Sequence, residues 1–188
     1  RPGERGRRGA PVHRGRRPGR AVDPDGLRRH RGVPVPGRAV IANAQYVYVT
    51  GISDQDIVTA QLENNETDGK ENWRRIVDGE AHATDVGHAM TLDFGGNLYV
   101  GGQLGFGCPA GQCDNRFAVV SYSPTGVQRF LGNSASAGTV PVVTVLSIVV
   151  LEDGSPALFG IQGERGPHFS KYSATGVREW GHNYITLS

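Results

Sequence analysis

The fold is decided by residues 96–130, which contain three short apolar segments separated by turns: Gly96-Asn-Leu-Tyr-Val-Gly-Gly102, Arg116-Phe-Ala-Val-Val-Ser-Tyr122 and Thr125-Gly-Val-Gln-Arg-Phe130. Short runs of aliphatic and aromatic residues bounded by glycine turns are typical of β-strands. A fourth apolar run, Ala89-Met-Thr-Leu92, lies just before them and is a candidate for a fully buried strand. Residues 89–130 therefore predict one unit of four antiparallel strands.

The same order of segments occurs on both sides of this unit, at residues 44–51, 56–62 and 68–73 and at residues 154–160, 167–172 and 175–180. Three kinds of residue keep their places in the three units: a strand-closing glycine (Gly51, Gly102, Gly160), a turn glycine (Gly69, Gly126, Gly176) and an aromatic residue four positions later (Trp73, Phe130, Trp180). Fixed spacing of this kind is the signature of a repeat architecture.

Four antiparallel strands that recur every 50 to 58 residues are typical of the blades of a β-propeller. We therefore predict an all-β fold, an incomplete β-propeller with about three four-stranded antiparallel blades. The units are expected at residues 39–77, 87–131 and 143–182 of a repeat region that spans residues 39–188. The tyrosines of these strands either pack between sheets or line a groove, and the pattern leaves both readings open.

The repeat resembles a known family at particular residues. A second strand that ends in Val-Thr-Gly51, a third that ends in Ser-Tyr122 or Lys-Tyr172, and a turn with Asp-Gly or Thr-Gly before an aromatic residue are similar to the bacterial β-propeller repeats called SBBP repeats. Three features depart from the family pattern: Phe130 replaces Trp, Pro156 interrupts a strand, and the segment ending at Gly160 lacks Thr. The resemblance implies a propeller repeat region in a bacterial protein.

Three blades do not close a ring, because propellers have four to eight blades. Either the remaining blades of a longer propeller complete the ring, or the chain associates to obtain them. The first residue is Arg1 rather than Met, which favours the expectation of a longer protein.

Residues 1–38 differ sharply from the repeats. They contain 12 of the 20 basic residues and three acidic ones, so this segment carries a charge of +9 and the remaining residues −7. The segment is rich in Arg, Gly and Pro, and we expect it to be disordered. A nucleic-acid partner is disfavoured, because the segment has no aromatic residue on which a base could stack.

A second hypothesis treats residues 1–38 as a degenerate or out-of-frame blade. Ala21-Val-Asp-Pro-Asp-Gly26 resembles the strand and turn that open the later units. Permitted codons for the residues that follow would encode Val-Val-Thr-Gly when read one nucleotide later. On this hypothesis the basic charge has no biological role.

Cys108 and Cys113 lie in an insertion between the second and third strands of their unit, with Pro109 and Gly111 between them. These residues allow a tight reversal of the chain, so we predict a disulfide in an exported protein. The expected location is secreted, periplasmic or at the cell surface.

Metal sites are only weakly indicated. His82, Asp85 and His88 are spaced like metal ligands, but their spacing of three brings side chains together on a helix, and this glycine-containing connection does not favour one. Asp54 and Asp56 follow Gly51 without the spacing of a calcium loop. Solvated polar residues are the preferred interpretation, and we predict no catalytic residue, no metal and no cofactor.

The function that this pattern favours is a non-catalytic propeller segment of a secreted or cell-envelope bacterial protein, acting as a scaffold that binds a protein or a glycan. The alternative is a fragment of a propeller enzyme, a lyase or hydrolase, with its site in the central channel. No run of 18 apolar residues is present, so no membrane-spanning helix is expected.

Overall fold

The computed structural model describes residues 37–65, 68–79, 82–106, 114–134 and 142–184. All of them belong to the second of two units into which the chain divides, Val35–Ser188. The Arg-rich segment up to residue 36 and the pair Cys108 and Cys113 lie outside the described residues. The predictions of N-terminal disorder, of an out-of-frame blade and of a disulfide therefore stay predictions.

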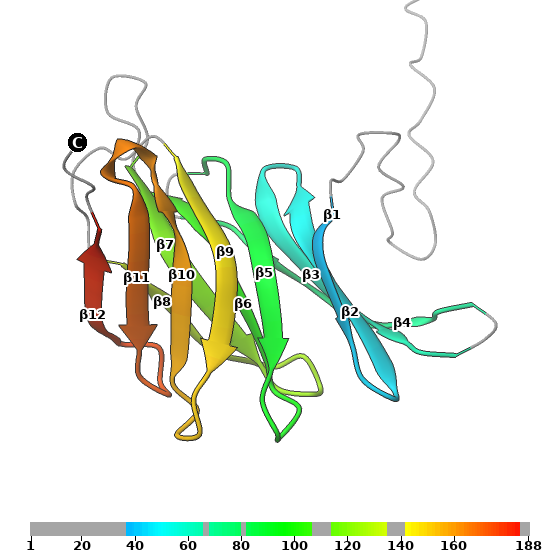
Figure 1. Ribbon diagram of the computed structural model, residues 1–188. Helices are drawn as coiled ribbons and strands as arrows, with labels where there is room; N and C mark the ends of the chain where they lie inside the picture. The colour runs from blue at the N-terminus through cyan, green and yellow to red at the C-terminus, as the bar shows by residue number, and fades with distance from the viewer. Residues whose placement is uncertain (1–36, 66–67, 80–81, 107–113, 135–141, 185–188) are drawn as a thin grey trace, which may run out of the picture. The chain divides into compact units, whose positions relative to one another are not determined.

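The described residues form three four-stranded antiparallel sheets (Figure 1). The first sheet contains β1 (Gly37–Ala42), β2 (Tyr46–Ser53), β3 (Asp56–Glu63) and β4 (Glu71–Val77). The second contains β5 (Val86–Leu92), β6 (Leu98–Phe106), β7 (Asp114–Tyr122) and β8 (Gln128–Asn133). The third contains β9 (Val143–Val150), β10 (Pro156–Gln162), β11 (Pro167–Tyr172) and β12 (Arg178–Asn183).

In each sheet the strands pair in the order of the chain, which confirms the predicted all-β fold and is consistent with the blades of a propeller-like fold. The helical element η2 (Gly163–Arg165) is a short 3₁₀ turn. Among the residues that the structure describes, no helix has the length and apolar character to cross a membrane.

The three sheets share local irregularities as well as strand order. The third strand of each sheet shifts register against the fourth at the same place, between Gln61 and Leu62, Ser121 and Tyr122, and Lys171 and Tyr172. A bulge repeated at one position increases the local twist of each sheet in the same way. Pro156 does not interrupt a strand but begins β10, where a residue without an N–H is tolerated.

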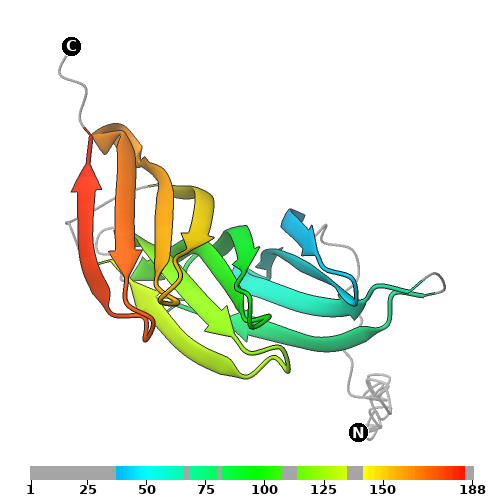
Figure 2. The ribbon, with the colours of Figure 1, turned by 60° about the horizontal axis from the view of Figure 1, so that its bottom comes forward.

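The second sheet is covered on both faces, because β5 lies beside β1 and also beside β9 (Figure 2). Along β7, Ala118 and Val120 belong to the core shared with the first sheet, whereas Phe117 and Val119 belong to the core shared with the third. Alternation along a strand thus sends successive side chains into two different cores. The hydrophobic stabilisation of the second sheet comes from both faces.

The strand tyrosines pack inside these cores. Tyr48, Tyr99, Tyr122 and Tyr172 are all essentially inaccessible to solvent. Tyr172 donates a hydrogen bond from its hydroxyl to the Phe117 carbonyl of the second sheet, at 3.2 Å. Burial raises the pKa of Tyr122 and of Tyr172 to about 12. Of the two readings left open by the sequence, packing between sheets is the one observed for these four residues.

Neighbouring sheets are joined by a contact between an aromatic ring and a turn glycine. The Trp73 ring of β4 lies so close to Gly126 that a Cβ on this glycine would stand 2.7 Å from the ring, and Phe130 of β8 lies against Gly176 in the same way. Both glycines have a positive φ, 78° and 84°, which other residues rarely adopt. The Trp73 Nε1 also donates a hydrogen bond to the Pro124 carbonyl, at 3.2 Å. A glycine is therefore required in this turn for two reasons, the positive φ of the backbone and the close approach of the aromatic ring.

Substitution of Gly126 tests this contact. We expect Gly126→Ala to lower the free energy of unfolding by roughly 2–4 kcal/mol, because a strained backbone and a clash with the Trp73 ring act together. Gly154→Ala is the matched control, since Gly154 has φ 79° and the nearest atom to a Cβ there would lie at 3.6 Å. Urea unfolding should show the control to be less destabilised by at least about 1 kcal/mol. Equal losses in the two variants would contradict the role of the ring contact.

Candidate functional site

A hollow opens between two turns of neighbouring sheets. The β5–β6 turn and the β9–β10 turn border a volume of about 390 Å³, lined by Leu92, Asp93, Phe94, Gly95, Val150, Leu151, Glu152 and Gly154. Ligand sites commonly combine an apolar lining with a few placed polar groups. This lining has both, because four apolar side chains stand beside two carboxylates.

The β5–β6 turn is held rigidly by Asp93. Its carboxylate accepts hydrogen bonds from the Asn97 backbone N–H and from the Asn97 side-chain amide, both at 2.8 Å, and from the Tyr99 hydroxyl at 3.2 Å. Burial acts to raise the pKa of Asp93, but the hydrogen bonds from Asn97 and Tyr99 outweigh it and hold the pKa below its usual value. Asp93 is therefore charged at neutral pH, and it positions the residue that follows it.

Phe94 is the residue that this turn presents. Its side chain is fully exposed, and Leu151 on the facing turn is 44% exposed. An aromatic ring offers a flat apolar surface to a ligand, and the exposed Glu152 supplies a carboxylate that accepts hydrogen bonds from hydroxyl or amide groups. Sequence reasoning missed Phe94, although an aromatic residue inside the turn Asp93-Phe-Gly-Gly96 was the available signal.

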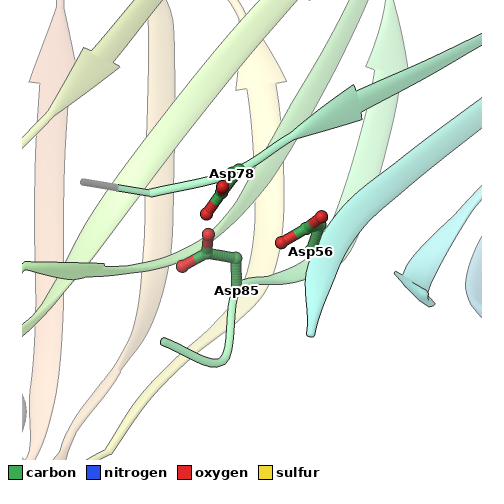
Figure 3. A group of neighbouring side chains, drawn as sticks. All are labelled: Asp56, Asp78 and Asp85. Atoms are coloured by element: carbon green, nitrogen blue, oxygen red, sulfur yellow. The ribbon is translucent and has the colours of Figure 1, made fainter. Parts of the chain in front are cut away.

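A second group of polar side chains lies where the first sheet connects to the second. Carboxylate oxygens of Asp56, Asp78 and Asp85 lie within 4.8 Å of one another (Figure 3). Asp56 begins β3 after the two-residue turn Asp54-Gln55, whose φ angles of 50° and 79° are those of a tight hairpin. Asp78 follows β4, and Asp85 precedes β5. Sequence reasoning did not select Asp78, and its place directly after a strand was the only signal.

Asp85 is the buried member of this group and acts on the backbone. Its carboxylate accepts hydrogen bonds from the Gly79 N–H and, at 2.7 Å, from the Gly105 N–H of β6, while its own N–H donates to the Gln55 carbonyl at 2.6 Å. Burial raises the pKa of Asp85, because these two hydrogen bonds to its charged form only partly offset the loss of water. Asp85 thus fastens three backbone segments together.

The other two aspartates are more accessible. Asp78 is paired with His82, whose Nδ1 lies 2.6 Å from a carboxylate oxygen. Burial together with the charges of Asp78 and Asp54 raises the pKa of Asp56, against the opposing charge of His82. Carboxylate oxygens suit hard cations such as Ca²⁺, but both oxygens of Asp85 already accept backbone N–H groups. The main role of this group of three aspartates is therefore structural.

His88 lies apart from this group, so the structure does not bring the weak candidates His82, Asp85 and His88 together as one ligand set. The His88 Nδ1 accepts a hydrogen bond from the Val145 N–H of β9, at 2.9 Å. Burial, and after it the charge of Arg38, lowers the pKa of His88 to about 4. His88 is thus a neutral residue that joins the inner strands of the second and third sheets.

No family model matches the chain, and no curated protein matches it either.

Removal of the Asp85 carboxylate tests its structural role. Asp85→Ala should lower the free energy of unfolding by roughly 2–4 kcal/mol, because it leaves two buried N–H groups without an acceptor. Asp78→Ala is the matched control from the same group and should cost less than about 1 kcal/mol, since its pair with His82 is exposed. Chemical unfolding followed by circular dichroism measures both, and a larger loss for Asp78→Ala would contradict the assignment.

The burial of neutral His88 predicts a pH dependence of stability. Below pH 6.5 the unfolded chain binds a proton at His88, but the folded chain does so only near pH 4. The stabilisation is therefore complete above pH 6.5. About 2 kcal/mol should be lost as the pH falls toward 4, which is less than the full shift would give because solvent screens the partly exposed ring. His88→Asn keeps an acceptor for the Val145 N–H but does not titrate, so its free energy of unfolding should fall less over this range.

Proposed function

We propose that the chain is a non-catalytic β-propeller repeat segment that serves as a binding scaffold, with a glycan as its ligand at the hollow between the β5–β6 and β9–β10 turns. The observation that carries the proposal is the fully exposed Phe94 ring at the edge of this hollow. A sugar ring presents apolar C–H groups on one face and hydroxyls at its rim. Phe94 suits the face, and Glu152 suits the hydroxyls. A protein ligand that inserts an apolar side chain is the second candidate, favoured by the four apolar residues of the lining.

Further parts of this proposal concern origin and location. Kinship with the bacterial SBBP-type repeats is supported by the strand-closing glycine, turn glycine and aromatic residue that recur in all three units. An extracytoplasmic location, whether secreted, periplasmic or on the cell surface, is supported by the spacing of Cys108 and Cys113 in a single insertion. The remaining blades of a propeller are the further partner that such a segment requires.

Substitution of Phe94 tests the glycan site. The full chain is applied to a glycan array, and the best-bound oligosaccharide is then titrated by calorimetry. Phe94→Ala should weaken binding at least tenfold, which corresponds to about 1.4 kcal/mol, because it removes the exposed ring. Val127→Ala is the matched control, since Val127 is 63% exposed but does not line the hollow. Unchanged affinity in Phe94→Ala, or no glycan bound by the wild type, would contradict the proposal.

A further inference from the structure

The two turns that border the hollow are joined by one buried hydroxyl group. Tyr99 of β6 is inaccessible to solvent. Its hydroxyl lies 3.2 Å from a carboxylate oxygen of Asp93 in the β5–β6 turn and 3.4 Å from the Gly154 carbonyl in the β9–β10 turn. Arg129 of β8 donates a hydrogen bond to the same hydroxyl, at 2.8 Å. The hollow therefore belongs to the packed structure and is not a gap between two unconnected turns.

The charged side chains that line the hollow are all acidic among the residues that the structure describes. Asp93 belongs to one of the two turns and Glu152 to the other, and the exposed Asp153 follows Glu152 in the chain. The Ser155 N–H donates a hydrogen bond to the Asp153 carboxylate at 2.9 Å, which lowers the pKa of Asp153. Both turns thus carry negative charge at neutral pH.

Two basic side chains contact this part of the structure, but neither lines the hollow. Lys171 is paired with Glu179, at 2.6 Å. Arg129 donates hydrogen bonds to the hydroxyl groups of Tyr99 and Ser121. Within the described part of the chain, no hydrogen bond or ion pair engages the Glu152 carboxylate. The charge of Glu152 is therefore available to a ligand.

The exposed ring of Phe94 favours the same kind of charge as Glu152. The face of an aromatic ring is negative and attracts an ammonium group that lies within about 6 Å of the ring centroid. Phe94 is fully exposed, and it lines the same hollow as Glu152. A hydroxyl group of a ligand would donate a hydrogen bond to Glu152 but would leave its charge unpaired. An ammonium group donates hydrogen bonds and also neutralises the charge.

We propose that the ligand of the hollow is an amino sugar, that is, a glycan in which a protonated amino group replaces a hydroxyl. This inference rests on the glycan site of the proposed function and narrows its ligand class. The sugar ring packs on Phe94, and the ammonium group donates to the Glu152 carboxylate. Asp93 and Asp153 attract the same group at longer range. Their charges disfavour acidic glycans, which carry carboxylate or sulfate groups.

Two oligosaccharides that differ only at nitrogen test the charge preference. A chitosan tetramer, which carries free amino groups, and the fully N-acetylated tetramer of the same linkage are titrated into the full chain by calorimetry at pH 6.5 and low salt. The chitosan tetramer should bind at least about fivefold more tightly, because an N-acetyl group carries no charge. The preference should fall below about twofold at high salt, where exposed charges are screened. It should also fall as the pH rises above about 8, because amino groups of this kind then lose their proton.

Substitution of Glu152 locates the preference in the hollow. Glu152→Gln keeps the shape of the side chain and removes its charge, so it should weaken binding of the chitosan tetramer about three- to fivefold. Its Kd for the N-acetylated tetramer should change less than about twofold. Glu71→Gln is the matched control, since it removes an exposed carboxylate of β4 that does not line the hollow. Phe94→Leu keeps an apolar side chain without an aromatic face and should reduce the preference for the amino sugar.

Two results would overturn the inference: an N-acetylated tetramer that binds as tightly as the chitosan tetramer, or equal effects of Glu152→Gln and Glu71→Gln. These outcomes are separate from the test of the glycan site. A neutral tetramer that binds equally well and depends on Phe94 overturns only the amino-sugar inference. Cadaverine, a diamine without a sugar ring, provides the opposite test, because binding as tight as that of the chitosan tetramer would overturn the glycan itself. Failure of every probe to bind overturns both proposals.

Discussion

The contact between a fourth-strand aromatic ring and the left-handed turn glycine of the next sheet is the constraint on which the rest of the structure depends. The contacts of Trp73 with Gly126 and of Phe130 with Gly176 set the distance between neighbouring sheets and the offset of one sheet along the next. A large aromatic ring buries much apolar area and approaches the backbone closely only where no Cβ intervenes. Because the same contact occurs twice, the three sheets stack in one repeating manner.

Polar groups fix the connections that the aromatic contacts leave undetermined. Asp85 loses hydration on burial, which raises its pKa, and it gains backbone N–H partners from Gly79 and Gly105. Its carboxylate holds the connection at Gly79 and strand β6 together because it accepts two backbone N–H groups at once, and the Asp85 N–H donates to the turn at Gln55. His88 does the same between sheets as a neutral acceptor. The contacts that hold these connections in place therefore depend on the charge states of Asp85 and His88.

The places available for recognition follow from this arrangement of contacts. Much of the apolar surface of the strands is occupied by sheet-to-sheet packing, whereas Phe94 and Leu151 are exposed on turns. Phe94 extends from a turn whose backbone is held by the hydrogen bonds between Asp93 and Asn97. Recognition residues on turns supported by a rigid sheet are common, since turns can vary without disturbing the core.

The sequence by itself determined the strands, their order in each sheet, the turn glycines and the aromatic positions, because antiparallel hairpins are set by alternation and turn chemistry within a few residues. The tertiary structure alone decided which equivalent residues differ in environment: Trp73 is covered and Trp180 is not, although their local sequences match. It also decided that Asp78 joins Asp85, and that His88 contacts Val145 rather than His82. The spacing of His82, Asp85 and His88 would bring their side chains together only on a helix. In an extended connection, the residues that lie next to each of them in space belong to other sheets and are distant in the sequence.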